Sequence, residues 1–296
     1  MTMDTTKKIL MLHGFVQLDK IFRQKTGGLR KSLKKMGYEL YFPCGPEIVD
    51  KSTLVHGDAN TNNDESKETI DKNNVARWFN TNIDNDTSEL YGWWVRTGSG
   101  KKAILEYDIP QNTFNYLHDY IIENGPFDGI IGFSQGAGLG GYITMDINNI
   151  LNLDSKQQPP LKFFISFSGF RLEPEKYQAP YEKINNKDNH VPASLHVQGE
   201  LDAVVSEARV MKLYNTWPED KRTLLKHPGS HFIPNSKPFV TQVCNWIHYI
   251  EQSNSTNLKN NDKKAINLEI KRDVRESSKN TLDDDLLDMM NSIGAL

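Results

Sequence analysis

The sequence predicts an α/β fold in which a mostly parallel central sheet carries helices on both faces. Short apolar runs, typical of buried strands, alternate along the chain with segments whose apolar residues recur at helical spacing. The 296 residues, 37% of them hydrophobic, suffice for one full-sized core with extra segments. One folded domain is therefore expected, over residues 1–252.

The elements follow from these patterns in chain order. The apolar runs predict strands over residues 9–12, 38–42, 129–133, 161–167, 194–198 and 223–226. Helical spacing predicts helices over residues 112–123 and 207–217. A final packed helix begins near Pro238, because proline suits the first turn of a helix.

A long polar insertion over residues 51–95 interrupts this alternation. Its first part is rich in Asn, Asp, Lys, Thr and Ser, and aromatic residues such as Trp93 and Trp94 stand near its end. Aromatic residues flanking a long loop suggest a lid or a pocket wall, and ordinary core packing is the alternative.

The C-terminal residues form two further segments. Residues 253–281 lack aromatic residues and carry many charges, so we expect a flexible linker. In residues 282–296, acidic residues at 283–285 precede an apolar stripe, and Thr281 can cap the segment, which predicts a short amphipathic acidic helix. Such a helix would either dock on its own domain or bind a groove of a partner protein.

Composition excludes several classes of protein. The net charge of −3 gives no broad electrostatic reason to expect nucleic acid or an anionic membrane as a ligand. The apolar stretch before His13 is too short for a signal peptide or a membrane span, so we expect no stable membrane insertion and a cytoplasmic location. Cys44 and Cys244 have neither CxxC nor metal-like spacing, and we expect both to be free.

The strongest chemical signal is the sequence GFSQG at residues 132–136. It follows a predicted strand and precedes a run of small residues, as in a sharp strand-to-helix turn that exposes a nucleophilic serine. Glycines flank Ser134 because a side chain there would collide with neighbouring backbone. At a helix N-terminus, the Gln135 N–H would point toward a developing oxyanion.

A second oxyanion donor is expected from the loop after an early strand. Residues 12–15, LHGF, occupy that position, and the Phe15 N–H is the candidate donor. We expect His13 to brace this loop through hydrogen bonds rather than to act as a base.

The general base should lie late in the chain, because the chain order for this kind of serine turn is nucleophile, acid, histidine. His231 lies in the turn-rich sequence HPGSHFIP, between the last predicted strand and the final helix. His227 is the competing candidate. A zinc site formed by this pair is disfavoured, because Pro228 and Gly229 prevent the regular helix that four-residue spacing requires.

The acid that orients this base is expected just past the strand at 194–198. Asp202 is the first candidate and Glu200 the alternative. A carboxylate at this position can hold the imidazole tautomer and stabilise the imidazolium that forms when Ser134 loses its proton.

With these sites placed, the chain resembles the fungal "family of serine hydrolases", the FSH group. The matching segments span about residues 7–251, and they are KILMLHGFVQ, TGGLRKSLKK, YFPCGPE, NGPFDGIIGFSQGAGLGGYI, KFFISFSGFR, LHVQGELDAVV and HPGSHFIPN. The resemblance implies an α/β-hydrolase fold, a triad of Ser134, Asp202 and His231, and hydrolysis of carboxylic esters, in particular acyl-chain esters, in the cytoplasm. The Asn-rich stretch near 56–75 is longer than the family's usual connection.

The expected activity is that of a carboxylesterase that forms an acyl-enzyme on Ser134 with no metal or organic cofactor. Its partner would be a small-molecule acyl ester, and four bulky apolar residues near the loop edge of the sheet are candidates for the acyl pocket: Trp93, Trp94, Phe170 and Phe232. A thioesterase, or a non-catalytic binding or adaptor protein that uses the C-terminal helix, remains an alternative, because a fold does not choose among these functions.

Overall fold

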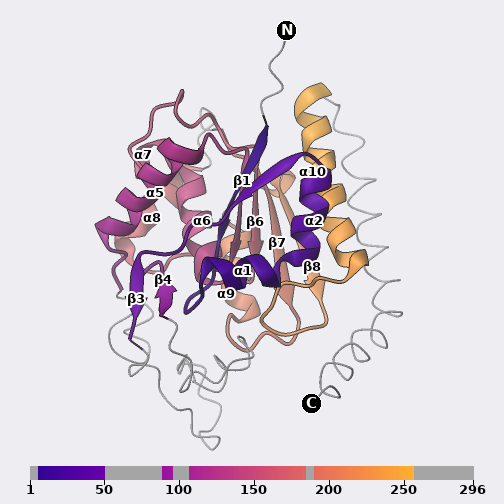
Figure 1. The fold of residues 1–296 in the computed structure, drawn as a ribbon, viewed down its shortest axis with the longest axis horizontal. Coiled ribbons are helices and arrows are strands. Elements are labelled where there is room, and N and C mark those ends of the chain that lie inside the picture. Colours follow the sequence, from indigo (N-terminus) through magenta and orange to yellow (C-terminus); the bar gives the residue numbers. More distant parts are fainter. Residues whose placement is uncertain (1–5, 51–88, 96–106, 185–189, 257–296) are drawn as a thin grey trace, which may run out of the picture.

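The computed structural model describes residues 6–50, 89–95, 107–184 and 190–256. Its centre is a parallel sheet of six strands, in the order β2-β1-β5-β6-β7-β8 (Figure 1). The strands are β1 (Lys7–Leu12), β2 (Tyr38–Tyr41), β5 (Gly129–Phe133), β6 (Phe163–Phe167), β7 (Ala193–Gly199) and β8 (Arg222–His227). All six predicted strands are therefore confirmed.

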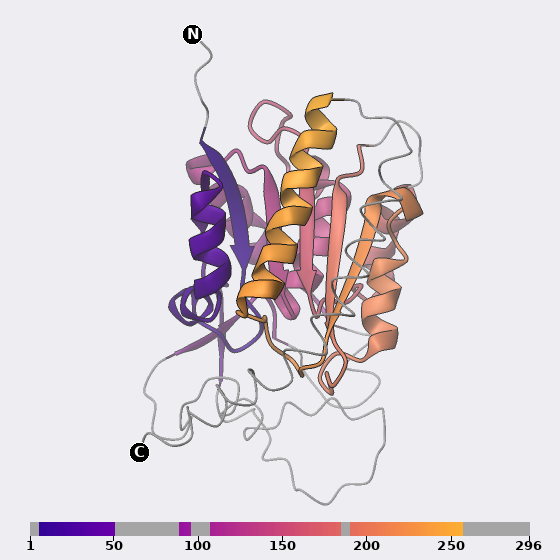
Figure 2. The ribbon, with the colours of Figure 1, turned by 90° about the vertical axis from the view of Figure 1, so that its right-hand side faces the viewer.

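Helices cover both faces of this sheet, which confirms the predicted fold class (Figures 1 and 2). One face packs against α1 (Asp19–Lys25), α2 (Gly27–Lys35) and α10 (Lys237–Thr256). The other packs against α5 (Gln111–Asn124), α6 (Gln135–Met145), α8 (Gln178–Lys183) and α9 (Glu207–Tyr214). Short helices α7 (Ile147–Ile150), η2 (Glu175–Tyr177) and η3 (Glu219–Lys221) lie in the connections.

Alternation along the strands explains the two cores. In β1, Leu10 and Leu12 belong to the α5–α6–α9 side, whereas Ile9 and Met11 belong to the α2–α10 side. Successive side chains of a strand point to opposite faces, so a strand covered on both sides needs an unbroken apolar run. This requirement is why the sequence shows continuous apolar runs rather than alternating ones.

A two-stranded antiparallel ribbon lies beside the sheet. It consists of β3 (Glu47–Val49) and β4 (Leu90–Gly92), so a strand lies within the end of the predicted insertion, residues 51–95. The Gln17 N–H donates to the carbonyl of Tyr91 at 3.1 Å, which attaches the ribbon to the loop after β1. The sequence patterns did not predict this ribbon, because its strands are only three residues long.

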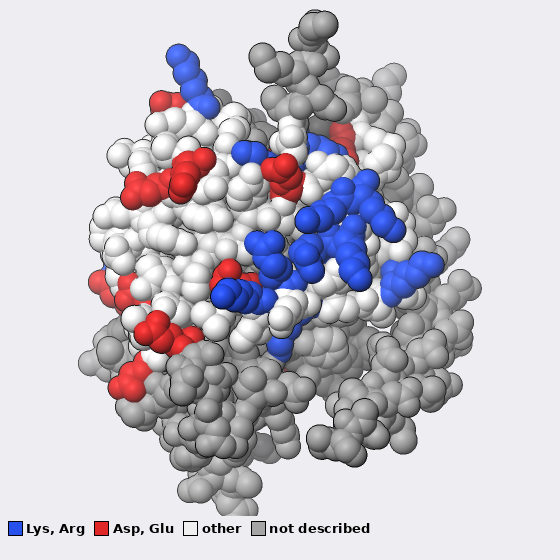
Figure 3. Space-filling model, in the orientation of Figure 1, with Lys and Arg blue, Asp and Glu red and all other residues white. Residues whose placement is uncertain are grey.

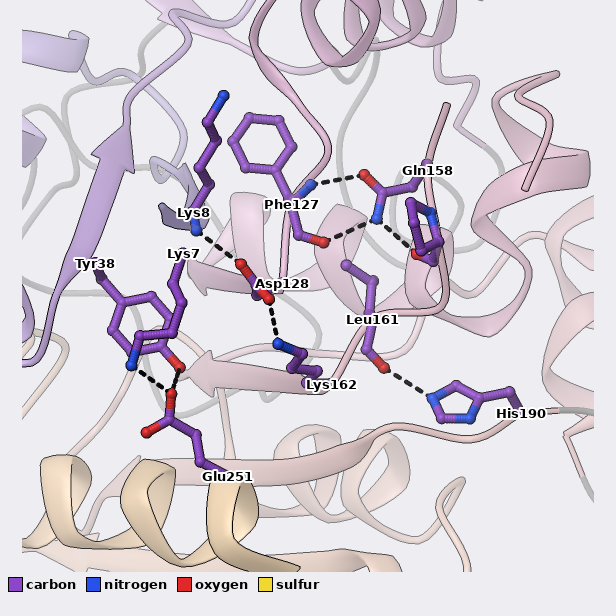
Figure 4. A network of polar contacts seen from close by, with 11 residues as sticks. Lys7, Lys8, Tyr38, Phe127, Asp128, Gln158, Leu161, Lys162, His190 and Glu251 are labelled. Carbon is purple, nitrogen blue, oxygen red and sulfur yellow. Dashed lines mark hydrogen bonds and ion pairs between the residues drawn. The ribbon is translucent and has the colours of Figure 1, made fainter. Parts of the chain in front are cut away.

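Charged side chains connect the sheet strands at their N-terminal ends, opposite the end of the sheet where Ser134 follows β5 (Figure 4). Glu251 of α10 accepts hydrogen bonds from the Lys7 ammonium at 2.6 Å and the Tyr38 hydroxyl at 2.7 Å. Asp128 accepts the Lys8 N–H at 2.8 Å and pairs with the Lys162 ammonium at 2.6 Å. These contacts tie β1, β2, β5 and α10 together at this edge.

The structure describes only part of the predicted insertion and of the predicted linker. Helix α10 extends to Thr256, so residues 253–256, which the sequence assigned to the linker, are helical. Residues 51–88, 257–281 and 282–296 lie outside the described residues, so the lid and the C-terminal helix stay predictions. Among the helices of the described ranges, none has both the length and the apolar composition needed to cross a membrane.

Candidate active site

Ser134 lies in a sharp turn between β5 and α6. Its φ of 51° and ψ of −116° are rare for a residue with a side chain, and the strained turn is held in place by the Ser134 N–H, which donates to the Phe167 carbonyl at 2.9 Å. A Cβ at Gly132 would lie 2.5 Å from the Gly136 carbonyl oxygen, and one at Gly136 would lie 2.3 Å from the His13 carbonyl oxygen. The predicted need for both glycines is confirmed.

His231 and Asp202 form a buried pair beside this turn. The His231 Nδ1 lies 2.8 Å from the Asp202 Oδ2, and their side chains are only 4% and 1% exposed. The His231 ring lies 4.8 Å from the Phe133 ring, so the imidazole sits against the residue that precedes Ser134. Because the carboxylate can only accept, the neutral ring carries its proton on Nδ1 and donates it to Asp202, which leaves Nε2 as the basic nitrogen.

Several donors hold Asp202 ionised. Burial raises the pKa of its carboxyl, but hydrogen bonds from His231, the Val205 N–H and the Ser168 hydroxyl, together with the charge of His231, outweigh burial and lower the pKa below its usual value. The N–H groups of Val204 and Val205 both donate to Oδ1 at 2.9 Å. The carboxylate is therefore charged and fixed in orientation at neutral pH. Sequence patterns missed Ser168, since nothing in them marks this serine.

Glu200, the alternative acid, and His227, the competing base, do not form a comparable pair. The Glu200 side chain is exposed, and its N–H donates to the His227 carbonyl. His227 packs against Phe232 and Phe239, and its Nδ1 accepts the Gly229 N–H at 3.2 Å. Burial lowers the pKa of His227 to about 4, although the nearby Asp202 charge acts in the opposite direction. The geometry thus pairs His231, not His227, with a carboxylate.

The candidate oxyanion donors lie next to Ser134. A Cβ added at Gly14 would be 3.4 Å from the Ser134 Cβ, so the loop that carries Phe15 lies directly against the serine. A Cβ added at Gly92 would contact both the Phe15 ring and the Gln135 Oε1, so the side chains of these two residues both lie close to Gly92. Within the described part of the chain, neither the Phe15 N–H nor the Gln135 N–H has a hydrogen-bond acceptor.

A family comparison identifies this arrangement. Residues 1–243 match the family described as "Serine hydrolase (FSH1)". The chain belongs to the FSH1 serine hydrolase family. It is therefore a serine hydrolase, and its parallel sheet with a serine at a strand-to-helix turn is the α/β-hydrolase fold.

Curated relatives agree with this assignment. The chain is 52% identical to "Family of serine hydrolases 3" of Saccharomyces cerevisiae, over 99% of this chain and 100% of that protein. It is 43% identical to "Family of serine hydrolases 2" of the same yeast, over 83% of this chain and 99% of that protein. It is also 30% identical to "Esterase OVCA2" of Danio rerio, over 77% of this chain and 90% of that protein.

In this FSH1 serine hydrolase, His13 braces the loop after β1, as predicted. Its Nδ1 lies 2.7 Å from the Gly14 carbonyl, and its Nε2 lies 2.8 Å from the Gly45 nitrogen. Because the Gly45 N–H must donate, we assign the proton of the neutral ring to Nδ1. Burial lowers the pKa of His13 to about 4, which keeps the ring neutral and unsuited to binding a second proton near pH 7.

The side chain of Gln135 takes part in a buried hydrogen-bond network with Trp93, Trp94 and the His13 carbonyl, which we call the clasp and which the sequence analysis missed. Its Oε1 accepts the Trp93 N–H at 2.9 Å, and its Nε2 donates to the Trp94 carbonyl at 2.8 Å. The Trp93 indole N–H donates to the His13 carbonyl at 2.8 Å. The clasp joins the serine turn, the loop after β1 and the end of the insertion. A glutamine that begins an otherwise small and apolar buried helix is the signal that could have revealed it.

The four predicted pocket residues divide into two groups. Trp93, Trp94 and Phe170 are buried in the core, where Trp94 stacks on Tyr107 at 5.3 Å and meets Phe170 edge to face. Phe232 is 46% exposed, next to His231. Trp93, Trp94 and Phe170 therefore pack in the core, which was the alternative to a pocket wall. Phe232 instead faces the exterior.

Proposed function

We propose that the protein hydrolyses carboxylic esters of acyl chains through an acyl-enzyme on Ser134. The observation that carries this proposal is the buried His231–Asp202 hydrogen bond of 2.8 Å, beside the strand end that bears the serine. Family membership supports hydrolysis by a nucleophilic serine, and the relative named as an esterase supports esters as the substrate class.

In the proposed reaction, the Ser134 hydroxyl attacks the acyl carbonyl while the His231 Nε2 takes its proton. Asp202 holds the tautomer and stabilises the imidazolium. The Phe15 and Gln135 N–H groups stabilise the oxyanion, and loss of one such donor typically costs about 10²–10³ in kcat. His231 then protonates the leaving alkoxide, and it next activates a water that releases the acid and regenerates Ser134.

The proposed acyl site lies at the rim rather than in the aromatic core. Phe232 and Leu201, which is 70% exposed, flank His231 and Asp202 in sequence and offer apolar surface. We assign contact with the acyl chain to Phe232. Trp93, Trp94 and Phe170 would support this site from the buried core rather than contact the acyl chain.

Active-site labelling tests the nucleophile. A fluorophosphonate probe should label the wild type and not Ser134→Ala, whereas Ser32→Ala, a change in α2 on one face of the sheet, should retain the label. Resistance of the wild type to the probe would contradict the proposed chemistry. A label that survives in Ser134→Ala would show that another residue is the nucleophile.

Leaving-group comparison distinguishes esters from thioesters, because the same catalytic groups can cleave both. Oxygen esters and thioesters with identical acyl chains of increasing length should be assayed with wild type and Phe232→Ala. The proposal predicts a higher kcat/KM for the oxygen esters and a preference for longer chains that weakens in Phe232→Ala. A consistent preference for thioesters would favour the thioesterase alternative.

A further inference from the structure

Helices α1 and α2 carry a surface whose charge differs in sign from that of the whole chain. Residues 20–35 contain seven Lys or Arg and no Asp or Glu, although the chain has a net charge of −3. We call this the α1–α2 basic surface, and it consists of Lys20, Arg23, Lys25, Arg30, Lys31, Lys34 and Lys35. Figure 3 shows Lys and Arg side chains gathered on this face.

Asp19, which begins α1, is the one acidic residue of these two helices. In the part of the chain that the structure describes, none of Lys20, Lys31, Lys34 and Lys35 forms a salt bridge, and all four side chains are exposed. The Arg23 guanidinium instead lies over the Phe42 ring, 4.5 Å from its centroid. Like charges this close together repel, so an anionic partner would lower the electrostatic free energy of the surface.

We propose that the acidic C-terminal segment, residues 282–296, docks on the α1–α2 basic surface of the same molecule. This segment contains four aspartates, at 283, 284, 285 and 288, and no Lys or Arg. The intervening residues 257–281 contain seven Lys or Arg against four Asp or Glu, so acidic charge is concentrated in the final segment. The charge of this segment therefore complements that of the helices.

The chain is long enough for this docking. Helix α2 packs beside α10, which ends at Thr256, and 25 residues separate Thr256 from Leu282. A flexible stretch of this length has a typical end-to-end distance of about 25–30 Å. Helix α10, with 20 residues, is about 30 Å long. If residues 257–281 form the flexible linker that the sequence predicts, their length suffices to reach any part of the neighbouring α2.

The acidic segment comes after the residues that the family model matches. The family match ends at residue 243, whereas the match to "Family of serine hydrolases 3" covers 99% of this chain. A chain that ends at Thr281 retains every described element, because the described residues end at 256. Such a truncated chain leaves the basic surface open for a test in trans.

Fluorescence anisotropy with a labelled peptide of residues 282–296 tests the proposal. The peptide should bind the truncated chain, and binding should weaken about tenfold or more between 50 and 300 mM NaCl, because salt screens exposed charges. It should bind the full chain about tenfold more weakly, because a tethered segment at an effective concentration of about 1 mM competes for the same surface. Replacing the four aspartates of the peptide with asparagine should abolish binding.

A matched pair of double variants locates the surface. In the truncated chain, Lys31→Glu with Lys34→Glu should weaken peptide binding about tenfold or more, whereas Lys156→Glu with Lys221→Glu, two exposed lysines elsewhere, should not. Absence of peptide binding, equal binding by the two double variants, or equal binding by the full and truncated chains would overturn the proposal. Binding of the truncated chain to phosphatidylserine vesicles but not to the peptide would also overturn it and mark a lipid-binding surface.

Discussion

At the scale of single residues, Asp202 combines a fixed orientation with a stable negative charge. One oxygen accepts two backbone N–H groups and the other faces His231, so rotation of the carboxylate would break three hydrogen bonds. Such a residue acts by holding the correct tautomer of the histidine, and its charge matters more than its volume.

Asp202→Asn should therefore lower kcat by a factor of about 10⁴, the scale seen when the orienting acid of a triad is neutralised. Glu200→Gln, a matched change of an exposed carboxylate two residues away, should leave kcat near the wild-type value. Steady-state hydrolysis of a p-nitrophenyl ester measures both variants. A near-normal rate in Asp202→Asn with a large loss in Glu200→Gln would move the acid role to Glu200.

Gln135 is the second residue whose side chain merits a test. Gln135→Met keeps the backbone N–H and the approximate volume, but it leaves the Trp93 N–H and the Trp94 carbonyl buried without partners. Each unsatisfied group costs about 1–3 kcal/mol. We expect the free energy of unfolding in urea to fall by about 2–6 kcal/mol, and kcat to fall more than KM changes, because the loop bearing Phe15 loses its support.

The matched control for that experiment is Gln157→Met, since Gln157 is an exposed glutamine whose side chain caps a surface turn. It should lower the free energy of unfolding by less than about 1 kcal/mol. Equal stability losses in the two variants would show that the clasp contributes nothing beyond a surface hydrogen bond.

At the scale of elements, the turn between β5 and α6 depends on contact between backbones. Gly136→Ala places a methyl group 2.3 Å from the His13 carbonyl oxygen, so the turn or the loop after β1 must move. We expect loss of most esterase activity and a lower melting temperature. Gly27→Ala at the start of α2, where an added Cβ meets nothing within 4 Å, should leave both unchanged or raise stability slightly. Wild-type activity in Gly136→Ala would contradict the geometry of the turn.

The elements also show what sequence patterns can and cannot predict. The six sheet strands were predictable because burial on both faces demands long apolar runs, and the turn at Ser134 was predictable because its glycines have no substitute. The β3–β4 ribbon was not, since strands of three residues held by Gln17 and Tyr91 leave no periodic signal. Trp93 and Trp94 suggested a pocket, but aromatic composition alone does not distinguish a pocket wall from a core.

At the scale of the whole molecule, three buried histidines make stability depend on pH. Burial lowers the pKa of His13 to about 4 and that of His196 to about 3; burial also lowers that of His227 to about 4, opposed by the Asp202 charge. In the unfolded chain, each histidine titrates near pH 6.5. Between these values the unfolded state binds more protons than the folded state, so stability is full above about pH 6.5 and falls as pH drops toward 4.

Urea denaturation between pH 7.5 and 4.5 measures this dependence. His196→Phe should flatten the slope, because the ring of His196 is fully buried among Phe164, Tyr214 and Trp217, and neither of its nitrogens has a hydrogen-bond partner among the described residues. His248→Gln, a change of an exposed histidine on α10, should leave the slope unchanged. An unchanged slope in His196→Phe would assign the pH dependence to other groups.

Across the molecule, the parallel sheet brings residues nearly a hundred positions apart to one edge, and the proposed chemistry depends on their convergence. A crystal structure of the covalent phosphonate adduct tests this most directly. We predict that phosphorus is bonded to the Ser134 Oγ, with a phosphonyl oxygen within hydrogen-bond distance of the Phe15 and Gln135 N–H groups and the His231 Nε2 facing the Oγ. An adduct on another residue, or a His231 ring turned away from Ser134 and separated from Asp202, would contradict the account.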